Sequence, residues 1–468
     1  MKQVLILAAF LSSSAAMADD PPGIVWEREY DFPSIFNDVV VASDGKIVCC
    51  GGTTTGLDLW CFDGVGDLLW QTGGGGTYTR GAARVISPPS GGYAVAGTCG
   101  LASGSGHDLY VSRYDAYGTA IWNTALERLQ SEDYGCDIAY LPDGGFAVCG
   151  DTTDASLGNQ AWILRFDSAG DTLWTRTLGW SYSDEAIALA YLNDGITVLV
   201  DGRPQGSDYR PILLRYDFAG NLLWTSYEEF SGYPCDLCST SSGYALMRKP
   251  NLMGDGTTFY VLDESGVIHQ EVGVAAGGMQ DMHTIQQTID CGYLISGADD
   301  YHDEPPVDDW NAHLSRYDQN GNWMWTHSLE SGNDNWFYSA TQIPQGGYVA
   351  AGQHYTYENV IHRGFMVRFA PETGIEQPVL SSSLSIQSCV PNPGTAVFTL
   401  NWTLGLPAAT EITIYDVSGR QRLVRGMGLA YEGEHSTQLD LHGLPSGCYL
   451  VVVSCGSERA STKLVLLR

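Results

Sequence analysis

One phrase, recurring about every fifty residues, constrains the fold of this chain more than any other feature. It consists of Arg, an aromatic residue, Asp, two variable residues and Gly, followed by Trp four positions later. One copy is Arg165-Phe166-Asp167, Gly170 and Trp174. Others end at Trp122, Trp224 and Trp325, and a weaker copy without the Arg ends at Trp70. A fixed period of this length indicates a repeat architecture.

Each repeat carries the signals for two β-hairpins. Apolar runs such as residues 161–164 have the length and β-propensity of buried strands. Asp-x-x-Gly supplies one turn, because Asp bonds the backbone ahead of it and Gly accepts a positive φ. Turns of the type Asp143-Gly144-Gly145 lie upstream. In the fourth copy, the predicted strands lie near residues 185–192, 196–200, 212–217 and 221–226.

Four-stranded units at this period predict a β-propeller. Residues 23–26 resemble a final strand with nothing before it, and the last repeat ends at Phe369 without a final strand. Pairing the two would close a ring of seven blades and remove an open sheet edge. The repeated Arg is interpreted as an ion pair or stack between blades, and the Trp as a packing residue. The predicted anchors are Trp26, Trp70, Trp122, Trp174, Trp224, Ile268 and Trp325, with the fifth repeat degenerate.

Composition divides the chain into four segments. Residues 1–18 have the basic start, apolar core and Ala-x-Ala end of a secretory signal peptide. The repeats occupy residues 23–374, a linker-like stretch residues 375–386, and a segment without the repeat residues 387–468. No other apolar stretch is long enough to span a bilayer. The sequence therefore predicts an exported, soluble protein of two domains.

The acidic balance belongs almost entirely to the repeats. The chain has 23 basic and 54 acidic side chains, a net charge of −31, but from residue 375 onward it has 6 basic and 7 acidic ones. Such a negative surface would repel nucleic acid and anionic membranes. The twelve cysteines fit an oxidising compartment. A disulfide from Cys61 to Cys49 or Cys50 is predicted, while Cys235 and Cys238 suit a local disulfide or packed thiols better than a zinc site.

The C-terminal segment carries the most specific motifs. It contains Val390-Pro391-Asn392-Pro393, then Tyr415-Asp416-Val417-Ser418-Gly419-Arg420, then Leu444-Pro445-Ser446-Gly447-Cys448-Tyr449. In this order they resemble the C-terminal sorting domain (type A) of type IX secretion cargo. The resemblance implies a small Ig-like β-sandwich, the type IX machinery as partner, and a secreted or anchored location outside a Gram-negative-type bacterial cell. The alternative is a general Ig-like module. The implied sorting residues are Lys463, Leu464, Val465, Leu466, Leu467 and Arg468.

The repeats are also similar, more loosely, to pyrroloquinoline-quinone-type repeats, although the turn here is one residue shorter. In that family a Trp from each blade docks on the next. The quinoprotein ligand cluster of Glu, Asn and Asp is not recognisable in this sequence, so no cofactor is expected as a requirement.

Candidate ligand residues come from the long loops on one face of the predicted ring. Aromatic side chains beside Asp and Asn suit sugars, which stack and form hydrogen bonds. An acidic loop offers carboxylates for calcium, with a merely solvated loop as the alternative. The candidate ligand-binding residues are Trp180, Tyr182, Trp310, Asp334, Trp336, Tyr355 and Tyr357, and the candidate calcium ligands are Asp299, Asp300, Asp303 and Asp308.

The favoured function is a non-enzymatic, secreted or cell-surface protein that binds glycan, protein or matrix. No nucleophile elbow, zinc-protease motif or phosphate-binding loop is present in the sequence. The alternative is a polysaccharide hydrolase or lyase, since a glycosidase needs only two carboxylates about 5–9 Å apart. A scaffold role within an envelope assembly is a third possibility.

Overall fold

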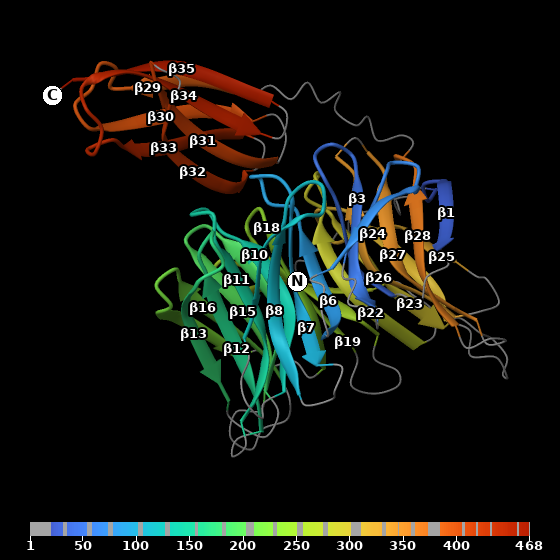
Figure 1. The fold of residues 1–468 in the computed structure, drawn as a ribbon. Helices are drawn as coiled ribbons and strands as arrows, with labels where there is room; N and C mark the ends of the chain where they lie inside the picture. The colour runs from blue at the N-terminus through green and yellow to red at the C-terminus, as the bar shows by residue number, and fades with distance from the viewer. Residues whose placement is uncertain are drawn as a thin grey trace, which may run out of the picture.

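The computed structural model describes most of the chain. The described residues are 20–30, 35–53, 59–73, 78–101, 106–126, 132–154, 158–179, 184–202, 210–227, 232–249, 256–274, 279–300, 310–329, 334–344, 346–356, 361–372, 384–404, 408–417, 420–430, 433–455 and 458–467. Every regular element among them is a β-strand, which confirms the all-β expectation (Figure 1).

The strands up to residue 369 form antiparallel groups of four, here called sheets 1 to 7. Sheet 1 is β2 (Ile35–Val41), β3 (Ile47–Thr53), β4 (Leu59–Phe62) and β5 (Leu68–Thr72); sheet 2 is β6 (Tyr78–Ile86), β7 (Tyr93–Leu101), β8 (His107–Tyr114) and β9 (Ala120–Ala125). Sheet 3 is β10 (Asp133–Tyr140), β11 (Phe146–Asp154), β12 (Gly158–Phe166) and β13 (Thr172–Leu178); sheet 4 is β14 (Glu185–Leu192), β15 (Gly195–Gly202), β16 (Arg210–Asp217) and β17 (Leu222–Tyr227). A short bridge between β3 and β6 joins sheets 1 and 2.

The remaining sheets repeat the order. Sheet 5 is β18 (Tyr233–Thr240), β19 (Gly243–Lys249), β20 (Thr258–Asp263) and β21 (Ile268–Gly273); sheet 6 is β22 (Met279–Gln287), β23 (Tyr293–Asp300), β24 (Asn311–Tyr317) and β25 (Trp323–Leu329). Sheet 7 is β26 (Asp334–Gln342), β27 (Tyr348–Thr356) and β28 (Ile361–Phe369), completed by β1 (Ile24–Tyr30). The four strands predicted for the fourth repeat match β14 to β17 to within two residues at every boundary.

The N-terminal strand completes the last sheet, as the sequence predicts. β1 runs antiparallel to β28, with Trp26 opposite Arg368 and Arg28 opposite Met366. The N–H of Ala370 also donates to the carbonyl of Gly23 at 2.8 Å. The beginning and the end of the repeat region are thus held by one ladder of hydrogen bonds.

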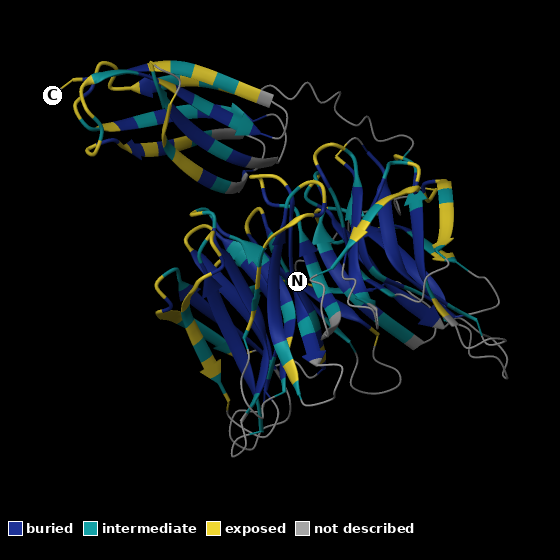
Figure 2. Cartoon of the chain, viewed as in Figure 1, coloured by how far each residue is buried: buried dark blue, intermediate teal, exposed yellow. Residues whose placement is uncertain are grey.

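Apolar cores lie between the sheets rather than within them. Each consecutive pair of sheets shares a cluster of buried residues, and sheets 7 and 1 share one containing Phe36, Trp60 and Met366. The first strands of consecutive sheets are in contact, including β26 with β2. Burial is greatest in the inner strands, while outer strands such as β13 alternate exposed and half-buried residues (Figure 2).

The repeated phrase interlocks neighbouring sheets. The Asp167 carboxylate accepts the N–H groups of Ala169 and Asp171 at 2.8 and 2.9 Å, and Gly170 has φ 88°. Trp122 of the preceding sheet packs on this turn and donates from Nε1 to the Ser168 carbonyl at 3.2 Å. A Cβ on Gly170 would lie 2.7 Å from the Trp122 ring. The glycine therefore serves both the turn and the close approach of the ring.

The same Trp-to-turn contact, called the latch from here on, recurs at other joints. The Trp rings lie against the turn glycines in the pairs Trp26–Gly66, Trp70–Gly118, Trp174–Gly220 and Trp224–Gly266. The predicted anchor Ile268 is wrong. In β21 the residue at the anchor position is Gln270, because it pairs with Val261 as Trp174 pairs with Arg165. Counting from the turn glycine would have found it, since Gln270 follows Gly266 by the same four positions.

The repeated Arg acts mainly inside its own sheet. Arg165 is fully buried and donates to the carbonyls of Phe146 and Phe166 and to the Asp143 carboxylate. It thereby joins the third strand of its sheet to the turn between the first two. The predicted contact between sheets holds for Arg215 and Arg316, which donate to the hydroxyls of a Tyr in the next sheet.

The predicted disulfide is wrong, because all twelve cysteines are free thiols. Cys50 lies opposite Leu59, and Cys61 lies opposite Val48. Cys50 and Cys61 are therefore diagonal neighbours, about 7–8 Å apart and beyond disulfide reach. Cys49 points to the other face of β3, where it joins a different core cluster. Cys235 and Cys238 match the packed-thiol alternative.

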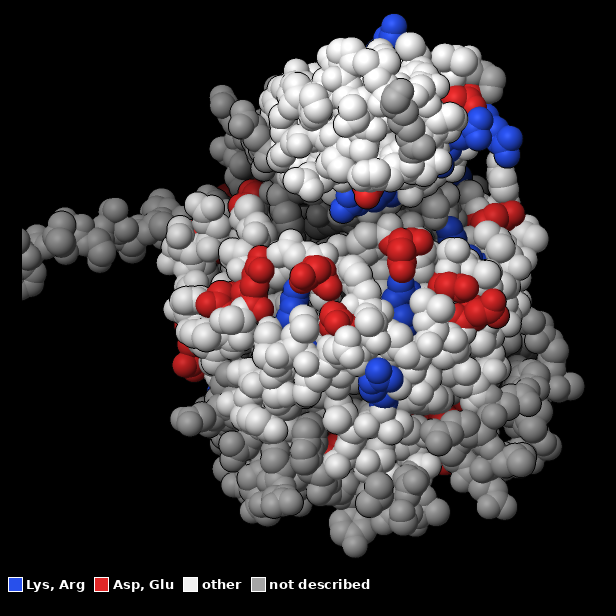
Figure 3. Space-filling model, turned by 90° about the vertical axis from the view of Figure 1, so that its left-hand side faces the viewer, with Lys and Arg blue, Asp and Glu red and all other residues white. Residues whose placement is uncertain are grey.

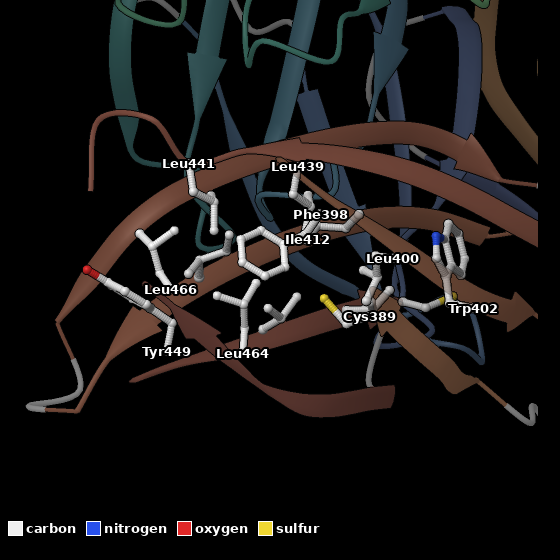
Figure 4. Packing of buried hydrophobic residues seen from close by; sticks show 14 of the residues in the cluster. Cys389, Phe398, Leu400, Trp402, Ile412, Leu439, Leu441, Tyr449, Leu464 and Leu466 are labelled. Carbon is white, nitrogen blue, oxygen red and sulfur yellow. The ribbon is translucent and has the colours of Figure 1, made fainter. Parts of the chain in front are cut away.

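The C-terminal strands form a separate sandwich of two sheets. One contains β29 (Ser385–Val390), β30 (Val397–Leu404) and β33 (Gly433–Asp440); the other contains β31 (Ala408–Asp416), β32 (Gln421–Ala430), β34 (Gly447–Cys455) and β35 (Glu458–Leu466). Phe398, Leu400 and Trp402 from the first sheet pack against Ile412 and Leu464 from the second (Figure 4). β29 begins two residues before the predicted domain start, since Ile386 packs on this core.

Candidate functional site

An aromatic cluster forms where sheets 6 and 7 meet. Trp310 directly precedes β24, Trp336 lies in β26, and their half-buried rings stack with centroids 6.3 Å apart at 27°. The N–H of Trp310 donates to Asp334 Oδ1 at 2.9 Å, and its carbonyl accepts the N–H of Asn335 at 2.7 Å. These two bonds fix the start of a sheet 6 strand against the first strand of sheet 7.

Strand register adds a second ring pair. Asp334 lies opposite Tyr355, and Trp336 lies opposite Gln353. Because side chains alternate along a strand, these four residues share one face of sheet 7. The Tyr355 ring lies 4.7 Å from the exposed His362 ring, and His362 Nδ1 is 3.1 Å from Gln353 Oε1. Four rings, a carboxylate and an amide are thus gathered at one end of this sheet.

The structure brings together four of the seven ligand residues predicted from sequence, namely Trp310, Asp334, Trp336 and Tyr355. Their role in binding stays a prediction. Sequence reasoning missed Gln353 and His362, because cross-strand register carries no local motif. The other three predicted residues, Trp180, Tyr182 and Tyr357, lie outside the described residues.

The predicted calcium ligands are not seen as a group. Asp299 is 3% exposed, and its oxygens lie 3.0 Å from His313 Nδ1 and 2.8 Å from Ser328 Oγ. It is therefore engaged inside sheet 6 and not presented to solvent as the sequence suggested. Asp300 ends β23, but its side chain is not described, and Asp303 and Asp308 lie outside the described residues.

A second polar cluster, unexpected from the sequence, lies at the inner strands. Arg84 of β6 reaches three buried carboxylates, with Asp236 at 2.5 Å, Asp137 at 3.5 Å and Asp38 at 3.9 Å. These Asp residues occupy the first strands of sheets 1, 3 and 5. They line a cavity of about 820 Å³, and Arg425 of the C-terminal sandwich also lines it.

Each of these carboxylates also joins its sheet to the next one. Asp38 accepts the N–H of Val85 at 2.9 Å, and Asp137 accepts that of Leu189 at 2.8 Å. Asp236 accepts that of Ile285 at 2.8 Å. The available sequence signal was Asp after a small polar residue and before an aliphatic one in alternate repeats, as in Cys136-Asp137-Ile138.

Burial sets the protonation of this cluster. It raises the pKa of Asp137 to about 7, although Arg84 opposes the rise. It raises the pKa of Asp38 as well, again against Arg84. Burial opposes the charge on Arg84, but the three carboxylates together raise the pKa of its guanidinium. One cation among three buried carboxylates favours retention of a proton near neutral pH.

A third group of carboxylates lies between sheets 3 and 4. Burial, followed by the charges of Glu185 and Asp133, raises the pKa of Asp151 to about 7. Asp151 lies opposite Tyr134 near the end of β11, and Glu185 begins β14. Tyr134 is 37% exposed, so this group borders solvent. A carboxyl group with a raised pKa beside a second carboxyl group is an arrangement that acid–base catalysis uses.

In the C-terminal sandwich, the opening and closing motifs lie side by side. Asn392 Nδ2 donates to the carbonyl of Lys463 at 2.6 Å, and its Oδ1 accepts the N–H of Val465 at 2.9 Å. Leu464 and Leu466 are fully buried in the core. The Pro-Asn-Pro opener therefore holds the terminal strand β35. Arg468 lies outside the described residues.

Residues 388–467 match the family model described as a secretion system C-terminal sorting domain. This segment is a type IX sorting domain. The resemblance drawn from the sequence is confirmed, and the tail indicates a secreted or cell-surface protein that engages the secretion machinery. In the view of Figure 3, acidic side chains gather over the repeat sheets, while most of the sorting domain is uncharged. Among the described residues, no helix is long and apolar enough to cross a membrane.

Other comparisons are distant. A stretch of 110 residues is 28% identical to regulatory protein FlaEY of Caulobacter vibrioides, covering 20% of this chain and 11% of that protein. The chain thus spans about a tenth of that relative's length.

Solved structures with some likeness include a fungal alcohol oxidase in complex with copper, at TM-score 0.48 and 12% identity over 96% of this chain and 100% of that one. A subtype N10 neuraminidase-like protein of A/little yellow-shouldered bat/Guatemala/060/2010 has TM-score 0.41 and 10% identity over 62% and 92%. A protein of unknown function from Dyadobacter fermentans has TM-score 0.41 and 13% identity over 62% and 95%. These scores are too low to assign a fold or an activity.

Proposed function

We propose that the seven sheets form a closed seven-bladed β-propeller. It is exported by means of an Ig-like sorting domain that follows it in the chain. Three observations support closure: the β1–β28 ladder, the contact of β26 with β2, and the apolar cluster shared by sheets 7 and 1. Deleting residues 23–28 should expose an edge and destabilise the fold by several kcal/mol, about as much as losing a packed strand. An unchanged unfolding midpoint would count against closure.

We further propose that the propeller binds glycans at the cell surface through the aromatic cluster of sheets 6 and 7. The observation that carries this proposal is the convergence of Trp310, Trp336 and Tyr355 with Asp334. Half-buried rings offer flat apolar faces to a sugar. A carboxylate accepts hydrogen bonds from the sugar hydroxyls, and an amide both donates to them and accepts from them. A protein or matrix ligand would use the same groups.

A glycan array tests this function. Trp336→Ala should weaken binding about tenfold, because losing about 1.4 kcal/mol of contact is one factor of ten. Trp323→Ala is the matched control, since Trp323 is 44% exposed but lies outside the cluster. Equal effects of the two variants, or no glycan bound by the intact chain, would refute the proposal. Running the array with and without millimolar calcium tests the loop carboxylates, and added calcium should strengthen binding if Asp303 and Asp308 hold the ion.

A polysaccharide hydrolase or lyase is the second candidate, favoured by Asp151 and Glu185. In that mechanism Asp151 would donate a proton to the leaving oxygen, and Glu185 would act as the second carboxyl group. Asp151→Asn should then abolish release of reducing ends from polysaccharide without weakening glycan binding. Retained activity in this variant would exclude the assignment of the acid.

A further inference from the structure

Two exposed aromatic rings stack where sheets 2 and 3 meet. His107 begins β8 and Tyr134 lies in β10, and their ring centroids are 5.5 Å apart at 27°. Glu132 lies beside both rings, with Oε2 2.5 Å from His107 Nδ1 and 3.5 Å from the Tyr134 hydroxyl. The side chains of His107 and Glu132 are 49% and 46% exposed, and Tyr134 is 37% exposed. These three residues, here called the ring pair, therefore offer two rings and one carboxylate to solvent.

The ring pair occupies the same places in the repeat as the aromatic cluster of sheets 6 and 7. His107 precedes the repeated Arg of its sheet by six positions, as Trp310 does in its own sheet. Tyr134 directly precedes the residue at which the β10–β11 register shifts, and Trp336 directly precedes the equivalent residue of β26. The two stacks also have the same interplanar angle of 27°. The repeat thus builds stacked rings at two separate pairs of neighbouring sheets.

The ring pair differs from the aromatic cluster in the polar groups around it. Register places Asp151 opposite Tyr134, where the aromatic cluster has an amide. Burial, followed by the charges of Glu132 and Asp151, raises the pKa of Tyr134, so both carboxyl groups act on its hydroxyl. Glu185 and Asp133 add their charges to the effect of burial on Asp151. Carboxyl groups therefore gather beside these rings, and carboxylates attract cations.

We propose that the ring pair binds a sugar that carries a free ammonium group, such as a glucosamine unit. A ring face attracts both the apolar face of a sugar and a nearby cation. Both contacts of the Glu132 carboxylate within the pair use Oε2, so Oε1 can accept a charge-assisted hydrogen bond from the ammonium. The choice of a sugar rests on the proposed glycan-binding function, while the choice of a cationic one rests on the carboxyl groups beside the rings.

Isothermal titration calorimetry of the full chain with glucosamine oligomers tests this site. Their N-acetylated forms are the matched ligands, because acetylation removes the ammonium charge and keeps the sugar ring. Wild type should bind the free-amine oligomers more tightly. Tyr134→Ala should weaken that binding about tenfold, because one ring face is lost. Tyr117→Ala is the control, since Tyr117 is 81% exposed and lies outside the ring pair.

Glu132→Gln separates the effect of charge from that of stacking. Gln keeps the shape of the side chain and removes its charge, so affinity for glucosamine oligomers should fall toward that for the N-acetylated forms. Because the Glu132 side chain is 46% exposed, this variant leaves the buried core intact. Oligolysine of equal charge is the third ligand, and it should bind more weakly than glucosamine oligomers because it has no sugar ring to stack.

The possible failures can be told apart. If Trp336→Ala abolishes glucosamine binding and Tyr134→Ala does not change it, the ring pair is no site, although the proposed glycan-binding function stands. If wild type binds no glucosamine oligomer, or binds the N-acetylated forms equally well, the inference is overturned whatever neutral glycans do. Equal affinity for oligolysine would overturn the assignment of a sugar as ligand.

Discussion

Two interfaces between neighbouring sheets, here called joints, are alike at the first strands and differ at the outer strands. The contact at the first strands is called the inner contact, and the contact of an outer strand with the next sheet's turn is called the rim. Between sheets 3 and 4, Asp137 accepts the N–H of Leu189; between sheets 5 and 6, Asp236 accepts that of Ile285. At the rim of the first joint, Trp174 packs on the turn of Gly220. At the rim of the second, Gln270 takes that place.

Where Gln270 replaces the Trp, the latch keeps its hydrogen bond to the turn but loses the packing of the aromatic ring. Trp174 Nε1 donates to the Phe218 carbonyl at 2.9 Å, and Gln270 Nε2 donates to the Asn320 carbonyl. Arg176 also lies over the Trp174 indole, with its guanidinium 5.2 Å from the ring centroid. At these two joints the hydrogen bond to the turn is shared, while the ring adds contact area that one joint does without.

The largest expected effect comes from removing the ring. Trp174→Ala should lower the free energy of unfolding by about 3 kcal/mol, because a packed ring and its hydrogen bond are lost together. Gln270→Ala should cost about 1 kcal/mol, since one hydrogen bond is lost at a partly exposed site. Urea unfolding of both variants measures the difference.

Equal losses in the two variants would mean that the ring contributes nothing beyond its hydrogen bond. Trp323→Ala serves as control for removing an indole without a latch. It should change the unfolding midpoint far less than Trp174→Ala.

These latches show what sequence can and cannot provide. The repeated phrase predicted the strands, the pairing of β1 with the last sheet and the packing role of Trp174. These predictions were possible because the repeat period and the turn residues can be read from short stretches of sequence. It misplaced the fifth anchor, because Ile268 was chosen by its apolar character and not by its distance from Gly266. The Arg84 cluster was missed because it depends on how separate repeats face one another. His362 and Gln353 were missed because their placement depends on cross-strand register within sheet 7.

The inner contact gives the next effect, which depends on pH. Asp137 has a folded pKa of about 7 against an ordinary value of 3.8, so the native state holds a proton that the unfolded state has released. Its contribution to stability is complete below the ordinary pKa and is lost as the pH rises toward 7. Between pH 5 and pH 8 this loss should be about 2–3 kcal/mol.

Asp137→Asn isolates this effect from the many other carboxylates, because Asn resembles the protonated acid. The variant should lose less stability than wild type between pH 5 and pH 8, measured by urea unfolding at each pH. Parallel pH profiles for the two proteins would show that Asp137 is ionised in the native state and that the inner contacts do not titrate.

The smallest expected effect is a gain at the joint between sheets 5 and 6. Gln270→Trp restores the indole at the anchor position, opposite Val261 and over Gly321. The turn glycine is already in place with φ 74°, so its backbone can accept a ring as Gly220 does. Stability should rise by about 1 kcal/mol, less than Trp174→Ala costs, because Val272 was not selected to pack beside an indole. Hydrogen exchange of β21 and β25 gives the local readout, and slower exchange there would show that the latch has formed. A loss of stability would mean that the residues around Gln270 are packed to fit glutamine and cannot accept an indole.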